Sequence, residues 1–572
     1  MSEMPAQERR SQQSKPDEKG VPTFDWSLTR STLTDEVRLV TGPFEVLPVI
    51  FVPGIMGSNL KSASDGKPVW RLDVLGRTSV PWTLAKEFVG KPAGARQTML
   101  HPDRVVVDSG GAVPGKNGTE RKWYADAGWG EIAEGSYQSY LRWLEDKLNP
   151  VEPNPARWRD YFQNEATWDA PPKPGAEPKL FPGIKMGLES EPFGAEKAFE
   201  SILTDDLIAR SKFRYPIYAF GYNWLASNTK AGDLLSQRIS QLVTYYNKGV
   251  FRCQQVLLVT HSMGGLVARA CAKLPGMADK IAGVVHGVMP SVGAAVAYRR
   301  CKVGLSEESL LAGWVIGSTG REVTAVFAQA PGALQLLPSK EYAPNWLKVS
   351  AQSATSQLSL PAAGGDPYDS IYLERRKWWG LVDESWLSPD GGTPIRWNQY
   401  ADAIDAAREF HVSISGFYHP VSYVYYGADA AQKSFEKVTW RIKPGLHPDN
   451  ATPPNISSIS GLNRDQIRTD GTSPEFVGGR TEITTYYGEL GGGVSVYDTS
   501  YWELHCEMQD GMGDGTVPVS SGSAPKKIGG SAIKQQFRMS GFDHEGSYKN
   551  PVAQRSSLYA LTKIVGVAKR ST

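Results

Sequence analysis

The stretch VLLVTHSMGGLVAR, residues 256–269, decides the fold of this chain. Its first five residues form a short apolar run, which predicts a buried strand. The apolar residues after Gly265 recur at helical spacing, so we expect a helix to begin shortly after Ser262. Small residues are needed at the sharp turn between the two elements, and Gly264 and Gly265 supply them. The sequence therefore predicts a strand, a tight turn that presents a serine, and a helix.

Strand and helix patterns alternate on both sides of this unit. VLPVIFVPGIMGSNL, residues 46–60, is a short β-branched run that enters a glycine loop, and FRYPIYAFGYNW, residues 213–224, has a second strand pattern. Residues 231–248 carry an apolar stripe on one helix face, and IAGVVHGV, residues 281–288, is again strand-like. Alternating elements with continuously apolar strands predict a mostly parallel sheet with helices on both faces.

The alternating pattern breaks after about residue 290 and returns near the C-terminus. There, residues 533–542 form a strand pattern and residues 551–569 an amphipathic helix pattern. We therefore predict one domain with a large inserted cap. The expected parts are a flexible polar tail over residues 1–39, a core over 40–290 and 500–572, and a cap or lid region over 291–499.

Ser262 has the sequence setting of a nucleophile elbow, in which a serine stands on a strained turn between strand and helix. The usual pattern is G-x-S-x-G, and Thr260 replaces the first glycine here. The pentapeptide alone would also suit an ordinary serine in a buried turn. The strand before it and the helix after it favour a nucleophile.

A serine nucleophile needs a base, and the base needs a carboxylate to orient it. In the α/β-hydrolase fold the chain order is serine, acid, histidine. His544 lies between the last predicted strand and the final helix, whereas the rival His505 precedes the best aspartate and breaks the order. The glycine loop GMGDGTVP indicates Asp514 as the acid. Asp510 and Asp543 are the alternatives.

Hydrolysis of an ester also needs N–H donors for the oxyanion of the transition state. One expected donor is the backbone N–H of Met263, which follows the nucleophile. The other is assigned to Met56 in the loop VPGIMGS, for which a plain turn is the alternative interpretation. We expect no metal and no cofactor, because the four cysteines include no close pair of the CxxC type.

Composition argues against two other classes of protein. The net charge is +2 and the basic residues form only short pairs, so we expect no nucleic-acid partner. No stretch approaches 18 apolar residues, which argues against a membrane-spanning helix. The first residues contain no apolar run, so we expect no secretory signal peptide and a protein made in the cytoplasm.

Taken together, these blocks resemble the lecithin:cholesterol acyltransferase-like and PGAP1-like lipases. VPGIMGSNL resembles their oxyanion loop, FGYNW their PYDWR-type segment, THSMGG their elbow and GDGTVP their acid loop. The departures are Thr260 for glycine and Asn223 for aspartate. The resemblance implies an α/β-hydrolase fold and a serine lipase or phospholipase that cleaves carboxylic esters of membrane glycerophospholipids. It also implies that Tyr222 and Trp224 line the substrate pocket.

Within this group, residues 284–300, VVHGVMPSVGAAVAYRR, resemble antibacterial lipase effectors of type VI secretion. That resemblance implies delivery into the periplasm of a target cell, transient contact with a phospholipid membrane surface, a spike or tube protein as carrier and an immunity protein. Residues 310–327 are expected to form a lid, with cap core as the alternative. An acyltransferase or thioesterase with the same triad, and a non-catalytic binding module, are the alternative functions.

Overall fold

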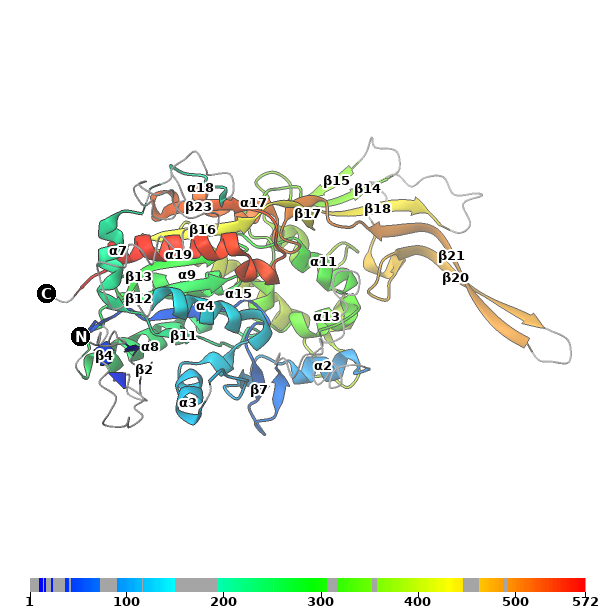
Figure 1. Ribbon diagram of the computed structural model, residues 1–572. Helices are drawn as coiled ribbons and strands as arrows, with labels where there is room; N and C mark the ends of the chain where they lie inside the picture. The colour runs from blue at the N-terminus through cyan, green and yellow to red at the C-terminus, as the bar shows by residue number, and fades with distance from the viewer. Residues whose placement is uncertain are drawn as a thin grey trace, which may run out of the picture.

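The structure is a computed structural model that places a sheet-and-helix body beside a long projecting hairpin (Figure 1). The predicted tail, residues 1–39, is described only in part, and there β1 (Arg10–Gln13) pairs in parallel with β4 (Val37–Val40). The described residues are 43–71, 90–115, 117–149, 193–198, 200, 202–249, 251–305, 316–351, 357–445, 462–486 and 492–570, with short strands between residues 10 and 40.

The body is built on a six-stranded sheet in the order β11-β6-β12-β13-β16-β23, in which all neighbouring strands are parallel. Most of these strands are buried on both faces, as expected where helices cover both sides. The strands are β6 (Val49–Val52), β11 (Ile217–Ala219), β12 (Val256–His261), β13 (Ile281–Gly287), β16 (Ser422–Gly427) and β23 (Ile533–Met539).

Two groups of helices cover this sheet. In one group, α8 (Asn228–Asn247) packs against α9 (Gly264–Lys273), which follows the nucleophile strand. In the other, α19 (Pro551–Gly566) lies on the sheet and contacts α4 (Ser139–Leu148) and α7 (Thr204–Ser211). The mostly parallel sheet with helices on both faces is thus confirmed.

The prediction that residues 291–499 form a single inserted cap is wrong. The stretch SYVYYG inside it forms β16, which lies in the central sheet between β13 and β23. Its six residues are all buried, and its run of tyrosine and valine is a typical strand pattern. The prediction missed it because its place depends on pairing with a distant strand, which a local pattern cannot show.

The rest of that region builds a second six-stranded sheet, in the order β15-β14-β18-β21-β20-β19. Its longest strands form the hairpin that projects away from the body in Figure 1. A separate two-stranded ladder pairs β17 (Asp429–Ser434) with β22 (Gly511–Gly513). The strands of the second sheet are β14 (Leu347–Ser350), β15 (Gln357–Leu360), β18 (Val438–Pro444), β19 (Ile467–Arg468), β20 (Glu475–Tyr486) and β21 (Gly492–Cys506).

The segment expected to form a lid, residues 310–327, is described from residue 316 onward. Residues 310–315, which carry the apolar spacing at its start, lie outside the described residues. Val323, Val326 and Phe327 are buried in α13 (Gly320–Phe327). Other elements of the described chain are α2 (Ala93–Met99), α3 (Gly118–Asp126), α11 (Val296–Val303), α14 (Pro331–Leu334), α15 (Trp397–Ile414), β7 (Leu60–Ser62), β8 (Pro68–Trp70) and β9 (Val105–Val107).

Among the helices that the structure describes, none combines the length and apolar character needed to cross a membrane. The four cysteines are buried. Burial raises the pKa of the Cys253, Cys271 and Cys301 thiols to about 12, so these thiols are poor nucleophiles.

Candidate active site

Ser262 stands on a strained turn at the end of β12. Its φ is 52°, in the left-handed region that a non-glycine residue adopts only when its surroundings hold it there. Its backbone N–H donates to the carbonyl of Gly287 at 2.9 Å, which fixes the turn to β13. A Cβ at Gly264 would collide with the carbonyl oxygen of Val52, so the turn requires glycine there. This is the geometry of a nucleophile elbow.

The structure brings Ser262, His544 and Asp514 together from three separate loops. His544 Nε2 lies 2.8 Å from Ser262 Oγ, and His544 Nδ1 lies 2.8 Å from Asp514 Oδ2. The Asp514 side chain is only 1% exposed, and its Oδ1 accepts the backbone N–H groups of Thr516 and Val517 at 3.0 and 2.7 Å. The loop therefore orients the carboxylate so that its second oxygen faces the imidazole.

The alternative acids and base have partners elsewhere. Asp510 accepts the backbone N–H of Lys437, and Asp543 accepts a backbone N–H within its own loop. His505 Nε2 lies 2.8 Å from Glu503 Oε2. Within the described part of the chain, none of the three hydrogen-bonds to the serine or to the imidazole of the triad.

The two expected oxyanion donors lie in the elbow itself and in the glycine loop that packs on it. Met263 follows it directly and precedes α9, and the first N–H groups of a helix have no partner within that helix. Met56 has a φ of 62° in the glycine loop, and its carbonyl accepts the indole N–H of Trp70 at 2.8 Å. A Cβ at Gly54 would lie 2.9 Å from the Cβ of Ser262, so this loop packs directly on the nucleophile.

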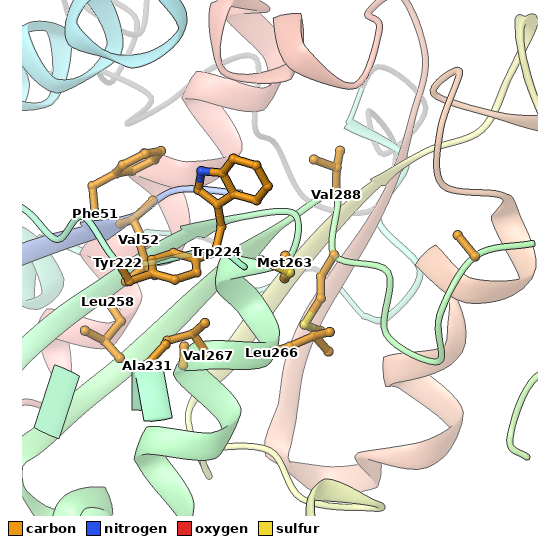
Figure 2. Close-up of a cluster of buried hydrophobic side chains, with 14 of the residues drawn as sticks. Phe51, Val52, Tyr222, Trp224, Ala231, Leu258, Met263, Leu266, Val267 and Val288 are labelled. Atoms are coloured by element: carbon orange, nitrogen blue, oxygen red, sulfur yellow. The ribbon is translucent and has the colours of Figure 1, made fainter. Parts of the chain in front are cut away.

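Tyr222 and Trp224 lie in the buried cluster beside the elbow, where Figure 2 draws them with Met263. The Tyr222 hydroxyl donates to the carbonyl of Pro53 at 2.9 Å, and burial raises the pKa of this phenol well above its usual value. The Trp224 ring meets Trp70 edge to face at 5.2 Å. Both residues support the glycine loop, and their role in a substrate pocket stays a prediction.

The two departures from the family pattern have structural explanations. The Asn223 amide donates to the carbonyls of Pro102 and Val105 at 2.7 and 3.0 Å, which an aspartate could not do because a carboxylate has no donor. The Thr260 hydroxyl lies 3.3 Å from Nδ1 of His286, whose pKa burial lowers to about 3. Both residues stabilise the strands and loops around the elbow.

Two residues next to the triad were not predicted from the sequence. His261, within THSMGG, contacts the backbone of the His544 loop, and its position beside the serine was an available signal. Tyr137, which none of the predicted strands and helices contains, contacts His261. Among the described residues, no group of three or more His, Cys, Asp or Glu side chains could hold a metal ion.

A parallel sheet, a strained serine after its strand β12 and the chain order serine, aspartate, histidine define an α/β-hydrolase fold. Residues 207–306 match the family model described as a PGAP1-like alpha/beta domain. The predicted resemblance to PGAP1-like lipases is therefore confirmed, and the fold is that of the α/β-hydrolases.

A solved structure gives a second comparison. The chain is similar, with a TM-score of 0.68 and 27% identity, to a chain of the structure entitled "The crystal structure of Tle4-Tli4 complex". The similarity covers 92% of this chain and 99% of the other. The comparison with curated proteins gave no match.

Proposed function

We propose that this protein is a serine lipase or phospholipase that hydrolyses the carboxylic ester bonds of membrane glycerophospholipids. The hydrogen-bonded chain from Asp514 through His544 to Ser262 carries the proposal. Because the Asp514 carboxylate accepts from Nδ1, the proton of a neutral imidazole is on that nitrogen. Nε2 is then free to accept the proton of Ser262 Oγ.

The reaction follows in two acyl-transfer steps. Ser262 Oγ attacks the ester carbonyl while His544 takes its proton, and the N–H groups of Met263 and Met56 stabilise the oxyanion. The intermediate collapses, and His544 returns the proton to the departing alcohol oxygen. Water then gives a proton to His544 and attacks the acyl-enzyme, which releases the carboxylic acid and restores Ser262.

The first test is Ser262→Ala with Ser556→Ala as the matched control. Ser556 is also a buried serine, but it lies in α19 and donates to the carbonyl of Val552. We expect Ser262→Ala to lose fluorophosphonate labelling and to slow hydrolysis of a short-chain ester by about 10⁶-fold. The control should keep both. A folded Ser262→Ala variant with more than about a tenth of the activity would assign the nucleophile to another residue.

The same assay separates the alternative functions. A thioesterase would prefer thioesters over oxygen esters, and an acyltransferase would move the acyl group to an added alcohol instead of water. A non-catalytic binding module would not react with the fluorophosphonate, because only an activated serine does so.

Membrane lipid as the substrate can be tested with a short-chain phospholipid. We expect the rate to rise sharply as the lipid concentration passes the micelle threshold, because apolar surface that opens toward the aggregate gains about 25 cal/mol per Å² buried. A smooth saturating curve, with equal rates on monomers, would instead indicate hydrolysis of soluble esters.

The biological role that we propose is an antibacterial effector of type VI secretion. The support is the sequence resemblance and the similarity to a chain of the Tle4–Tli4 complex. By analogy, a spike or tube protein would carry the enzyme to the periplasm of a target cell, and an immunity protein would inhibit it. Directing the protein to the periplasm of a test bacterium should be toxic, and Ser262→Ala should abolish the toxicity. Toxicity of the Ser262→Ala variant would contradict a role through hydrolysis.

A further inference from the structure

A second histidine lies beside the triad and connects two of its loops. His261 is the last residue of β12 and is buried, with Nε2 2.8 Å from the backbone carbonyl of His544. Its Nδ1 lies 3.0 Å from the hydroxyl of Tyr137, in the short helix η2 (Glu134–Gln138). The same hydroxyl accepts the backbone N–H of Gly54 at 3.4 Å.

The chemistry of these groups fixes the direction of each hydrogen bond. A carbonyl only accepts, so Nε2 of His261 must carry a proton and donate it to the carbonyl of His544. Burial lowers the pKa of His261 to about 3, so the ring is neutral and Nδ1 is an acceptor. Tyr137 therefore donates to Nδ1, and its oxygen accepts from Gly54. Every donor in this chain of bonds has an acceptor.

The hydrogen-bonded chain connects the loops of the site whose relative positions the reaction depends on. Gly54 belongs to the glycine loop that packs on Ser262, and His544 begins the loop of the base. Ser136, also in η2, donates to Glu545 Oε1 at 2.7 Å and gives the base loop a second link to the same helix. The bonds of the His544 imidazole to Asp514 and Ser262 hold the side chain but not the backbone of that loop.

We propose that Tyr137 and His261 are positioning residues that hold the oxyanion loop, the nucleophile and the base at their reacting distances. This inference rests on the proposed serine hydrolase function. Neither residue hydrogen-bonds to the reacting atoms. His261 acts through the backbone carbonyl of His544 and through its ring, which packs on the His544 imidazole with the ring centroids 5.1 Å apart. Tyr137 acts through His261 and Gly54. A displacement of about 1 Å at a reacting group can cost about 100-fold in rate.

The test compares His261→Ala and Tyr137→Phe with Tyr215→Phe. The control removes another buried hydroxyl, which donates to the carbonyl of Arg210 at 2.6 Å. Tyr215 precedes β11 at the amino end of that strand, whereas the triad follows the carboxyl ends of the sheet strands. The readouts are kcat and KM on a soluble ester and the melting temperature. The kcat is expressed per active site, which is titrated with a fluorophosphonate. We expect kcat to fall about 100-fold in His261→Ala and about 10-fold in Tyr137→Phe. KM should change little, and the control should keep its kcat even where its melting temperature falls.

Two conservative variants separate positioning from general support of the fold. His261→Gln places an amide donor near the former Nε2 and should recover part of the lost kcat. His261→Asn reaches only the Nδ1 position, next to Tyr137, and should not recover it. Equal kcat in the Gln and Asn variants would overturn the link through the His544 carbonyl.

The positioning inference and the proposed function can fail separately. If Ser262→Ala is inactive but His261→Ala turns over at the rate of the Tyr215→Phe control, only the positioning inference is wrong. If folded Ser262→Ala remains active, the proposed nucleophile is wrong, and the positioning inference is overturned with it.

Discussion

The two six-stranded sheets contribute to the candidate site in different ways. In the central sheet all strands are parallel, and Ser262 and His544 follow the carboxyl ends of β12 and β23. The second sheet is mostly antiparallel and holds none of the triad residues. Its strand β21 nevertheless leads through β22 directly to Asp514.

The difference follows from strand direction. Parallel strands all end at the same edge of a sheet, so their loops meet there, whereas neighbouring antiparallel strands end at opposite edges. The acid loop reaches the common edge because β22 pairs with β17, which follows β16 of the central sheet. A Cβ at Gly427, the last residue of β16, would lie 2.6 Å from the Cβ of Asp514. The central sheet thus also positions Asp514, although this residue follows a strand of the second sheet in the chain.

The largest effect that this comparison predicts is the loss of the base at the common edge. We expect His544→Ala to lower kcat by about 10⁶-fold, as much as Ser262→Ala, because the two residues act as a unit. The double variant should be no slower than either single variant. If the double variant instead loses kcat by the product of the two single losses, measured by steady-state kinetics, the two residues do not share a proton transfer.

Asp514→Asn should have the next largest effect, and it tests the triad residue that follows the second sheet in the chain. An amide in place of the carboxylate favours the wrong imidazole tautomer, so we expect kcat to fall about 10⁴-fold. Asp510→Asn is the matched control, since Asp510 lies in the same segment as Asp514 but accepts the backbone N–H of Lys437. Full activity in Asp514→Asn together with its loss in Asp510→Asn would transfer the acid role to Asp510.

A buried ion pair allows the second sheet to be weakened without touching the triad. Lys302 Nζ lies 3.6 Å from Glu475 Oε1 at the start of β20, and both side chains are 1% exposed. Lys302→Met removes the ammonium group from beside this buried carboxylate, and breaking a buried ion pair typically costs about 3–5 kcal/mol. Denaturant unfolding should show this loss, while kcat per titrated active site stays unchanged. A fall in kcat without a loss of stability would mean that this sheet also controls the chemistry.

The sequence predicted the parts of the molecule that depend on local pattern. The strands and helices around Ser262 and the fold class were predicted correctly, because apolar strands and an amphipathic helix follow directly from residue spacing. The structure also brings Asp514 and His544 to Ser262, as chain order suggested. Their catalytic roles stay predictions.

The features that the sequence could not give depend on long-range pairing. β16 was assigned to the cap because nothing in SYVYYG specifies its parallel partners. Tyr137 was missed because its contact with His261 joins residues 124 positions apart. The explanation for Asn223 also required the structure, since the two carbonyls that it binds lie over 100 residues earlier in the chain.

The smallest predicted effect concerns the residue at which the elbow departs from its usual pattern. Thr260 lies in β12, where glycine weakens a strand by about 0.5–1 kcal/mol, and Thr260→Gly also removes the hydroxyl beside His286. We expect the free energy of unfolding to fall by about 1–2 kcal/mol. kcat should stay within about threefold of the parent, because Ser262 keeps its strained turn through Gly264 and Gly287. Gly264→Ala is the informative contrast. Its new Cβ would collide with the backbone of Val52, so this variant should lose activity or fail to fold. A much larger effect of Thr260→Gly on kcat would show that the first position of the elbow shapes the chemistry and not only the strand.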